Sequence, residues 1–460
     1  MADSPPDDKD KSLEYSLKDG SAFSVMTGFG EQYLNPLAIE LGASNIQIGL
    51  LASVPPFIAS LAQLYTTRLV SIIRGRRQVI TKSVLLQALM WIPLVLIPII
   101  LVPHKVSLLI FFVVLYFVFG QFVAPVWNSL MGDLVDEDVR GRFFGMRNKI
   151  TGAVAFFSLF AAGFILSMFP KDRIMYGFAL IFSVAFAARI VSWHYLGRMR
   201  NPPVTSAREA EFSFIQYLKK LRETNYGRFA LYYGLMNFTV NIASPFFTVY
   251  LLRDLHLPYY EYTIITASVA LASFLTMTYW GRLADRYGNA KILTFCGALV
   301  PVVPILWLFS KDVTYLVLIQ AVSGFAWAGF NLSASNYMFD TVKPLKRTRV
   351  FSYHNVLAGS SIFLGAMLGG LMSKVITSPW IFYSNLQILF LISGLLRAGV
   401  SLIFLPKIRE VREVEQITTK DFFIKYSGTG PILGLTYRAV TGLHRSFTRD
   451  GGARARGRAA

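Results

Sequence analysis

Two stretches of this chain, about 207 residues apart, read almost as copies of each other. One is NSLMGDLVDEDVRGRFFGMRN, residues 128–148, and the other is SNYMFDTVKPLKRTRVFSYHN, residues 335–355. Aligned without a gap, they pair identical residues at Met131 and Met338, Asp133 and Asp340, Val135 and Val342, Arg140 and Arg347, Arg142 and Arg349, Phe144 and Phe351, and Asn148 and Asn355. The polypeptide is therefore predicted to be a duplicated unit, with one copy of the segment in each half.

Each copy joins one long apolar run to the next, so the duplicated unit is predicted to be a membrane bundle. The chain is 54% hydrophobic and 15% charged, against about 45–50% and about 25% in soluble domains. Apolar stretches of about 20 residues, taken as membrane spans, number about twelve: 18–42, 46–73, 78–102, 106–134, 141–169, 171–198, 223–253, 259–286, 289–311, 312–341, 345–377 and 379–406. We expect an all-α integral membrane protein with two pseudo-symmetric six-helix bundles, a build typical of secondary transporters.

The division of the chain follows from the same pattern. We expect an N-terminal tail at 1–16, a first bundle at 17–198, a polar linker with an amphipathic helix at 199–222, a second bundle at 223–406 and a C-terminal tail at 407–460. The linker helix is expected to lie along the membrane surface, because Phe212, Phe214, Ile215 and Leu218 recur at helical spacing.

Cations indicate the orientation of the spans. They gather after the even-numbered spans, for example Arg140, Arg142, Arg147 and Lys149 after the fourth, whereas the odd-numbered connections carry one or two each. By the positive-inside rule both tails are expected in the cytoplasm, with the protein in the plasma (inner) membrane. The formal net charge of +19 then reflects membrane edges and lipid contact, and a nucleic-acid partner is not expected.

Between the eighth and ninth spans the chain reads Gly281-Arg282-Leu283-Ala284-Asp285-Arg286-Tyr287-Gly288. This resembles the signature cytoplasmic loop of the major facilitator superfamily, and the resemblance covers roughly residues 17–406. It implies a latch between helices that breaks when the cytoplasmic side opens, with Asp285 pairing to Arg286 or to cations on a neighbouring span. The candidate latch residues are Gly281, Asp285, Arg286, Gly288, Asp133, Arg140, Arg142, Asp340, Arg347 and Arg349.

Two departures from the family pattern limit what the resemblance implies. The equivalent loop of the first half has Ser71 near the position of the usual Asp, so that half is expected to rely on Asp133 and Arg140 instead. The Gly-Pro signature that many drug/proton antiporters carry in span five is missing between Gly152 and Gly163. The drug-antiporter interpretation therefore loses support.

One carboxylate lies in the middle of the first span. The sequence GFGEQYLNP places Glu31 near mid-depth, where a charged acid out of water costs several kcal/mol. Such an acid is protonated, paired or open to an aqueous cavity, which makes Glu31 the candidate proton-coupling site. The alternative is a structural anchor. Aligning Pro36 with Pro245 puts Val240 opposite Glu31, so the acid belongs to the first half alone.

Polar and aromatic side chains on spans one, four, seven and ten are the candidates for contact with a substrate. These are the spans that line the cavity in the family, and amides there suit hydrogen bonds to a polar solute, although bonds between helices are their commoner use. The candidates are Gln32, Tyr33, Asn35, Gln121, Trp127, Asn237, Asn241, Trp327 and Asn331. Arg189 and Arg397, at like places in spans six and twelve, are interpreted as structural or snorkelling cations.

No feature of the sequence indicates an enzyme. The five histidines have no metal-ligand spacing, no phosphate-binding loop is present, and we expect no metal or cofactor. We expect a monomeric secondary active transporter of a small organic solute, working by alternating access and coupled to protons through Glu31. The alternatives are a facilitative uniporter, and a protein of this fold that no longer transports and serves as a receptor, assembly factor or lipid scramblase.

Overall fold

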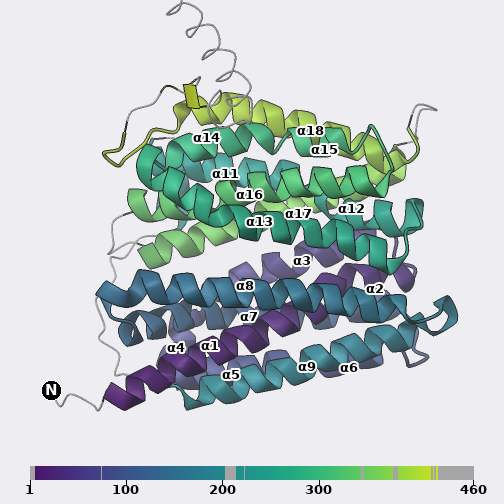
Figure 1. The fold of residues 1–460 in the computed structure, drawn as a ribbon, viewed down its shortest axis with the longest axis horizontal. Coiled ribbons are helices and arrows are strands. Elements are labelled where there is room, and N and C mark those ends of the chain that lie inside the picture. Colours follow the sequence, from purple (N-terminus) through teal and green to yellow (C-terminus); the bar gives the residue numbers. More distant parts are fainter. Residues whose placement is uncertain are drawn as a thin grey trace, which may run out of the picture.

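The computed structural model describes residues 6–73, 75–201, 214–221, 223–342, 347–376, 382–415, 418, 421 and 422. Its elements are helices that run side by side through the bundle (Figure 1). Both the start of α1 and the end of α18 lie at one end, which we call the terminal end, and we call the opposite end the far end. The twelve predicted spans are confirmed, and several are broken into consecutive helices.

The first half supplies six spans. They are α1 (Pro6–Phe29) with η1 (Glu31–Tyr33) and α2 (Leu34–Glu40); α3 (Asn45–Gln63) with α4 (Thr66–Ile73); α5 (Arg76–Leu89) with α6 (Trp91–Leu96); α7 (Lys105–Leu134); α8 (Glu137–Ser167); and η2 (Lys171–Arg173) with α9 (Ile174–Arg198).

The second half repeats this order after a short helix, α10 (Phe214–Lys219). Its spans are α11 (Asn225–Asn241) with α12 (Ser244–Val249) and η3 (Tyr250–Asp254); α13 (Tyr259–Tyr287); α14 (Asn289–Leu299) with α15 (Val302–Leu306); α16 (Val313–Thr341); α17 (Arg347–Val375); and α18 (Asn385–Phe404) with η5 (Leu405–Lys407).

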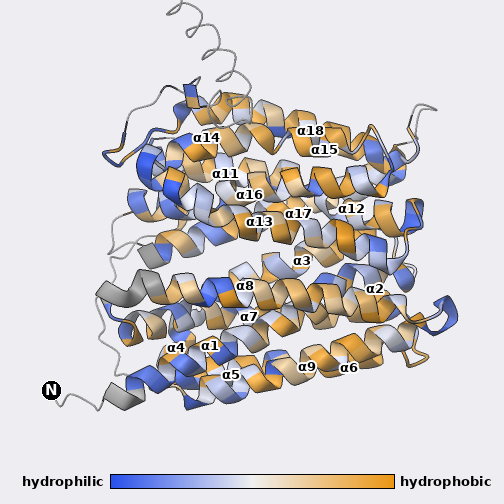
Figure 2. Ribbon diagram, in the orientation of Figure 1, coloured by the Kyte–Doolittle hydropathy of each residue, from blue (hydrophilic) through white to orange (hydrophobic). Residues whose placement is uncertain are grey.

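Hydropathy along these helices fits a bundle that crosses a membrane. Among the described residues, eleven helices are long and apolar enough to span one. The remaining span is the first one, α1 to α2. It is not among the eleven, because it is interrupted at Gly30 and carries several charges. Apolar residues fill the middle of the bundle and hydrophilic residues gather at both ends (Figure 2).

The segments expected outside the spans are described only in part. Helix α1 already begins at Pro6, inside the expected 1–16 tail. Residues 202–213, most of the expected linker helix, lie outside the described part, as do most residues beyond 415. Within α10, Tyr217 is buried against the protein, whereas Ile215 and Leu218 are exposed, so the surface position of the linker helix stays a prediction.

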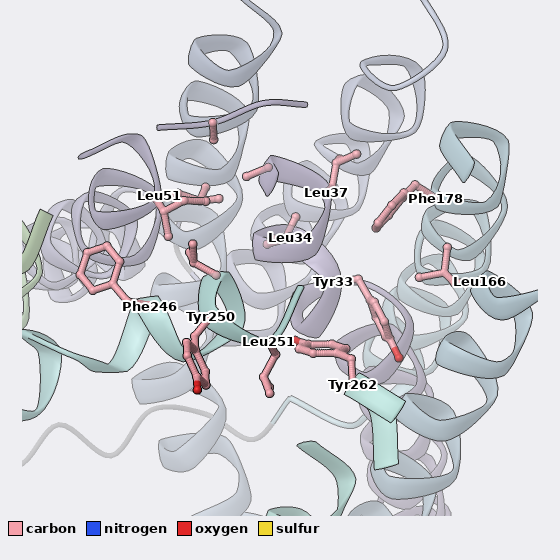
Figure 3. Packing of buried hydrophobic residues seen from close by; sticks show 14 of the residues in the cluster. Tyr33, Leu34, Leu37, Leu51, Leu166, Phe178, Phe246, Tyr250, Leu251 and Tyr262 are labelled. Atoms are coloured by element: carbon pink, nitrogen blue, oxygen red, sulfur yellow. The ribbon is translucent and has the colours of Figure 1, made fainter. Parts of the chain in front are cut away.

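The halves are packed together most closely at the far end. There a single apolar cluster takes residues from both halves, including Tyr33, Leu37 and Phe178 from the first and Phe246 and Tyr262 from the second (Figure 3). The other buried clusters of the described residues each stay within one half: one joins α5, α7 and α9, and two belong to the second half. Between the halves, α3 packs against α17 and α8 against α13.

Candidate functional site

A break in the first span positions the candidate acid. Helix α1 ends at Phe29, and the single turn Glu31–Tyr33 separates it from α2. The ring of Trp91 packs so closely on Gly30 that a Cβ atom there would clash with it. The seventh span is broken in the corresponding place, between α11 and α12. Broken spans free backbone groups near the membrane centre, where transporters place their sites.

Glu31 is half-buried at this break and bonds to the fourth span. The Tyr116 hydroxyl donates to Glu31 Oε1 at 2.5 Å. Tyr116 is fully buried, and its ring meets that of Trp91 edge-on with the centroids 5.2 Å apart. No Lys or Arg of the described residues lies within ion-pair distance of the Glu31 carboxylate. Tyr116 therefore anchors an acid that has no direct cationic partner.

A buried polar network lies beside this acid, toward the terminal end. Asp19, on α1, accepts a bond from Ser192 Oγ at 2.6 Å, and Ser192 accepts from Arg189 Nη1 at 2.9 Å. Arg189 also donates to Gln87 Oε1 through Nε at 2.9 Å and through Nη2 at 2.5 Å. Asp19 and Arg189 are 5% and 3% exposed. The positive charge of Arg189 acts on both Asp19 and Glu31.

The guanidinium of Arg147, on α8, also belongs to this network. Arg147 Nη2 lies 3.7 Å from Asp19 Oδ2, and Arg147 Nε donates to the Ser16 carbonyl at 3.2 Å. The same guanidinium stacks over the ring of Trp127, 4.5 Å from its centroid. The candidate Trp127 is thus joined to Asp19 through Arg147, which makes a cation–π contact with the indole ring.

The candidate Gln121 takes part in a bridge between the halves. Gln63 Oε1, on α3, accepts one bond from Gln121 Nε2 and another from Asn355 Nδ2 of α17, both at 3.1 Å. The bridge joins spans two, four and eleven. It involves Asn355, a residue of the duplicated segment.

The other predicted substrate contacts lie in different environments. Tyr33 is fully buried and bonds to the Leu159 carbonyl at 2.8 Å and to Thr263 Oγ1 at 3.2 Å, so it joins the halves. Asn237 and Asn241 each donate to a backbone carbonyl one turn earlier in α11, at 2.8 Å. Half-buried or exposed positions are taken by Gln32, Asn35, Trp327 and Asn331.

Arg189 and Arg397 are buried rather than snorkelling to the surface. Arg397 is 2% exposed, and it donates to Ser393 Oγ at 3.0 Å and to the Val240 carbonyl at 3.3 Å. Val240 is the residue that corresponds to Glu31 in the second half. Arg397 therefore bonds the helix break of the second half, whereas Arg189 bonds Gln87 and Ser192 of the network around Asp19. Of the two matching positions only Glu31 is a carboxylate.

Two aspartates of the duplicated segment make matching ties at the terminal end. Asp133 Oδ2 pairs with Arg76 Nη2 at 2.6 Å, and Asp340 Oδ2 accepts from Asn289 Nδ2 at 2.8 Å. Each tie joins the end of the fourth span of a half to the start of its third. Arg349 is half-buried on α17. The side chains of the other predicted latch cations, Arg140, Arg142 and Arg347, lie outside the described residues.

The signature loop binds the segment that follows the last span. Arg286 pairs with Glu415 through Nε at 2.5 Å and through Nη2 at 3.1 Å. Asp285, a predicted latch residue, lies 4.0 Å from Arg412, so its carboxylate is within reach of a cation of that following segment. Gly281 lies within α13, and Gly288, with φ of 88°, ends that helix in a conformation that favours glycine. Glu410 accepts from the Ala290 amide at 2.8 Å, at the start of α14.

Sequence reasoning missed Asp19, Tyr116 and Gln63. Asp19 could have been found, because it is an acid inside an expected span. Tyr116 and Gln63 give no such signal, since their roles depend on which side of a helix faces Glu31 or the other half.

Two six-helix halves that repeat one order of spans are the architecture of a membrane transporter. The chain belongs to the Major Facilitator Superfamily, whose family model matches residues 21–235 and 229–435. The expected family resemblance is confirmed.

Individual relatives are similar over part of their length. Multidrug resistance protein 3 of Bacillus subtilis is 26% identical over 128 residues, which cover 28% of this chain and 25% of that protein. The class H tetracycline resistance protein of Pasteurella multocida is 29% identical over 137 residues, covering 30% and 34%. The chain thus matches about a third or less of the length of these relatives.

Solved structures share the fold over nearly the whole chain. The nucleoside transporter NupG superposes with a TM-score of 0.63 at 14% identity, covering 87% of this chain and 99% of that one. A bacterial homologue of the iron transporter ferroportin, in an inward-facing state, superposes with a TM-score of 0.64 at 15% identity, covering 89% of this chain and all of that one. At these identities the likeness is one of fold.

Proposed function

We propose that this protein is a proton-coupled secondary transporter of a small neutral or amphiphilic organic solute, with Glu31 as the proton-coupling residue. The observation that carries the proposal is the position of Glu31. It is a half-buried carboxylate at the break of the first span, held by Tyr116 and without a direct cationic partner among the described residues.

The bond to Tyr116 suits an acid that gains and loses a proton. A phenol can donate to a carboxylate and can also accept from a carboxylic acid, so the side chain keeps a partner in both states. No ion pair of the described residues holds this carboxylate permanently in its charged form. These features support a reversible proton site over a fixed structural anchor, whose acid would be paired permanently.

The state of the bundle supports alternating access. At the far end the halves are joined by a shared apolar cluster and by polar bonds, such as Tyr259 to Glu40 at 2.7 Å and Arg253 to Asn45 at 3.0 Å. Toward the terminal end the buried clusters belong to single halves. A shared apolar cluster at one end, and clusters confined to single halves toward the other, suit a transporter that opens to one side at a time.

The substrate class is inferred from the polar groups near the breaks. Gln32 and Asn331 are exposed, and an exposed amide inside a membrane requires a water-filled cavity. With Gln121, Trp127 and Trp327 they would offer hydrogen bonds and aromatic surface, which suit a neutral or amphiphilic solute. The names of the relatives, resistance and efflux proteins, favour amphiphilic compounds. The missing Gly-Pro signature of span five speaks against a typical drug antiporter.

Orientation and location belong to the same proposal. The cations at the terminal end favour both termini in the cytoplasm of a cell whose plasma membrane holds the protein, as a monomer. The far end would then face outward, and the described state would be open to the cytoplasm.

The first experiment is a thermal-shift screen of wild type and Glu31→Gln with sugars, amino acids, carboxylates, nucleosides and amphiphilic drugs, at about pH 6 and about pH 8. A stabilising ligand identifies the substrate class by mass action. We expect its effect to depend on pH in wild type and not in Glu31→Gln. The control is Glu14→Gln, which makes the same charge change on the exposed side of α1.

Transport of the identified ligand into proteoliposomes then decides the mechanism. We expect Glu31→Gln to abolish accumulation driven by a pH gradient while sparing exchange. Accumulation that is unchanged in Glu31→Gln contradicts the proton site, and saturable flux that no gradient drives indicates a uniporter. No stabilisation and no saturable flux would favour a protein that does not transport.

A further inference from the structure

A basic depression lies at the terminal end of the first half, away from the site at the helix breaks. Two cavities, of about 580 Å³ and about 500 Å³, share Arg77 and Arg198 in their walls. Together they form one hollow bounded by the starts of α1 and α5 and by the end of α9. None of the residues that line the hollow belongs to the proposed proton site or to the candidate substrate contacts, so its role is independent of the proposed transport function.

The walls of this hollow concentrate positive charge. The first cavity is lined by Lys11, Arg77, Arg198 and Arg200, and the second adds Lys82. None of the residues lining either cavity is an Asp or Glu. Cations that converge from three helices without an acid among them are arranged for an anion with several oxygen atoms.

The backbone fixes part of this arrangement. Arg77 Nη1 donates to the Met199 carbonyl at 3.2 Å, and the Arg200 amide donates to Ser12 Oγ at 3.1 Å. These bonds hold the start of α5 and the end of α9 against α1. The cations therefore come from segments that are already joined, so an anion would meet a preformed site.

One wall of the hollow is apolar and leads into the membrane-facing surface. Leu85 and Trp193 line the second cavity, and Leu86, Leu89 and Val191 are exposed on the same two helices. A Trp beside cations is typical of the membrane interface. Basic pockets between spans at the membrane edge are suited to anionic lipid headgroups.

We propose that this hollow binds a phosphate-bearing anion, with the guanidinium groups of Arg77 and Arg198 on the phosphate and Lys82 at its edge. A lipid headgroup and a soluble phosphate ester share this chemistry. The apolar wall fits an anionic phospholipid, whose acyl chains would run along Leu86 and Leu89.

The test measures stabilisation of the full-length protein in vesicles of phosphatidylcholine alone or with phosphatidylglycerol, and in detergent with glycerol phosphate. The variant is Lys82→Gln/Arg198→Gln, which removes two exposed charges and keeps Arg77 in its bond to Met199. The matched control is Arg282→Gln/Lys407→Gln, which removes two exposed charges at the same end of the other half.

We expect phosphatidylglycerol to raise the melting temperature of wild type and control, and the variant to need on the order of tenfold more of this lipid for the same shift. An effect of glycerol phosphate that is lost in the variant would support the site with a soluble ligand. Equal responses of variant and control to both ligands would overturn the proposal. If the double variant melts at a lower temperature than wild type in phosphatidylcholine alone, the shift caused by phosphatidylglycerol is compared between wild type and the single variant Arg198→Gln.

Discussion

Asp133 and Asp340, at equal places in the duplicated segment, perform one structural task with different partners. Asp133 pairs with the guanidinium of Arg76 at 2.6 Å, whereas Asp340 accepts from the amide of Asn289 at 2.8 Å. The tie between the third and fourth spans is thus an ion pair in the first half and a hydrogen bond from an uncharged amide in the second. Because Arg76 is 4% exposed, the ionic tie is the one whose loss leaves a buried charge.

This difference predicts unequal costs for the same substitution. Asp133→Ala should lower the free energy of unfolding by about 2 kcal/mol, less than for a fully buried pair because Asp133 is partly exposed. Asp340→Ala should cost about 1 kcal/mol, the value of one ordinary hydrogen bond. Melting of the two variants in detergent checks the order, and an equal or larger loss for Asp340→Ala would contradict it.

The buried network around Asp19 predicts strong coupling between two side chains. Asp19→Asn should destabilise the protein by about 3 kcal/mol, because Arg189 and Arg147 would keep buried charges without a carboxylate. The double variant Asp19→Asn/Arg147→Gln should lose less than the sum of the two single changes. The same melting assay completes this cycle, and strict additivity would show that the two groups act independently.

The bonds at the far end predict a shift between states. Arg253→Gln removes a cation that bonds Asn45 and the Ala43 carbonyl across the halves, so it should favour opening of that end. Spin labels on cysteines replacing Lys171 and Lys311, exposed at the far end of either half, should report a larger population at long distance. Arg173→Gln, an exposed neighbour of Lys171, is the control, and an unchanged distribution in Arg253→Gln would show that the bonds do not hold the closed end.

The contacts of the segment after the last span should protect the backbone amides next to the signature loop from hydrogen exchange. Glu410→Ala removes the acceptor for the Ala290 amide, a capping bond with a value of about 1 kcal/mol. Hydrogen exchange at the start of α14 should become about fivefold faster, since each 1.4 kcal/mol is tenfold in an equilibrium constant. Glu413→Ala in the same segment serves as the control, and equal exchange in both variants would assign the protection to other contacts.

The sequence predicted the halves and their spans. It singled out Glu31 as an acid inside the first span, but it did not predict the helix break at which Glu31 lies. The duplicated segment also indicated Asp133 and Asp340, because both halves keep an aspartate at this position. Their partners, Arg76 and Asn289, differ between the halves. The sequence alone could not predict that Tyr116 faces Glu31 or that Gln63 bridges the halves. In a membrane bundle most faces of a helix are apolar, so periodicity does not reveal which face a side chain occupies. Those contacts are fixed by the rotation of each helix in the packed bundle.

Glu31 in the first half corresponds to the uncharged Val240 in the second. This difference has a consequence for the energy that drives the proposed transport. With one proton carried by Glu31 in each cycle and a neutral solute, each turnover moves one net elementary charge through the membrane. Such a charge exchanges about 2.3 kcal/mol with a potential of 100 mV. A carrier built this way would respond to voltage even when the pH is equal on both sides, which a symmetric protein with an uncharged pair at its breaks would not do.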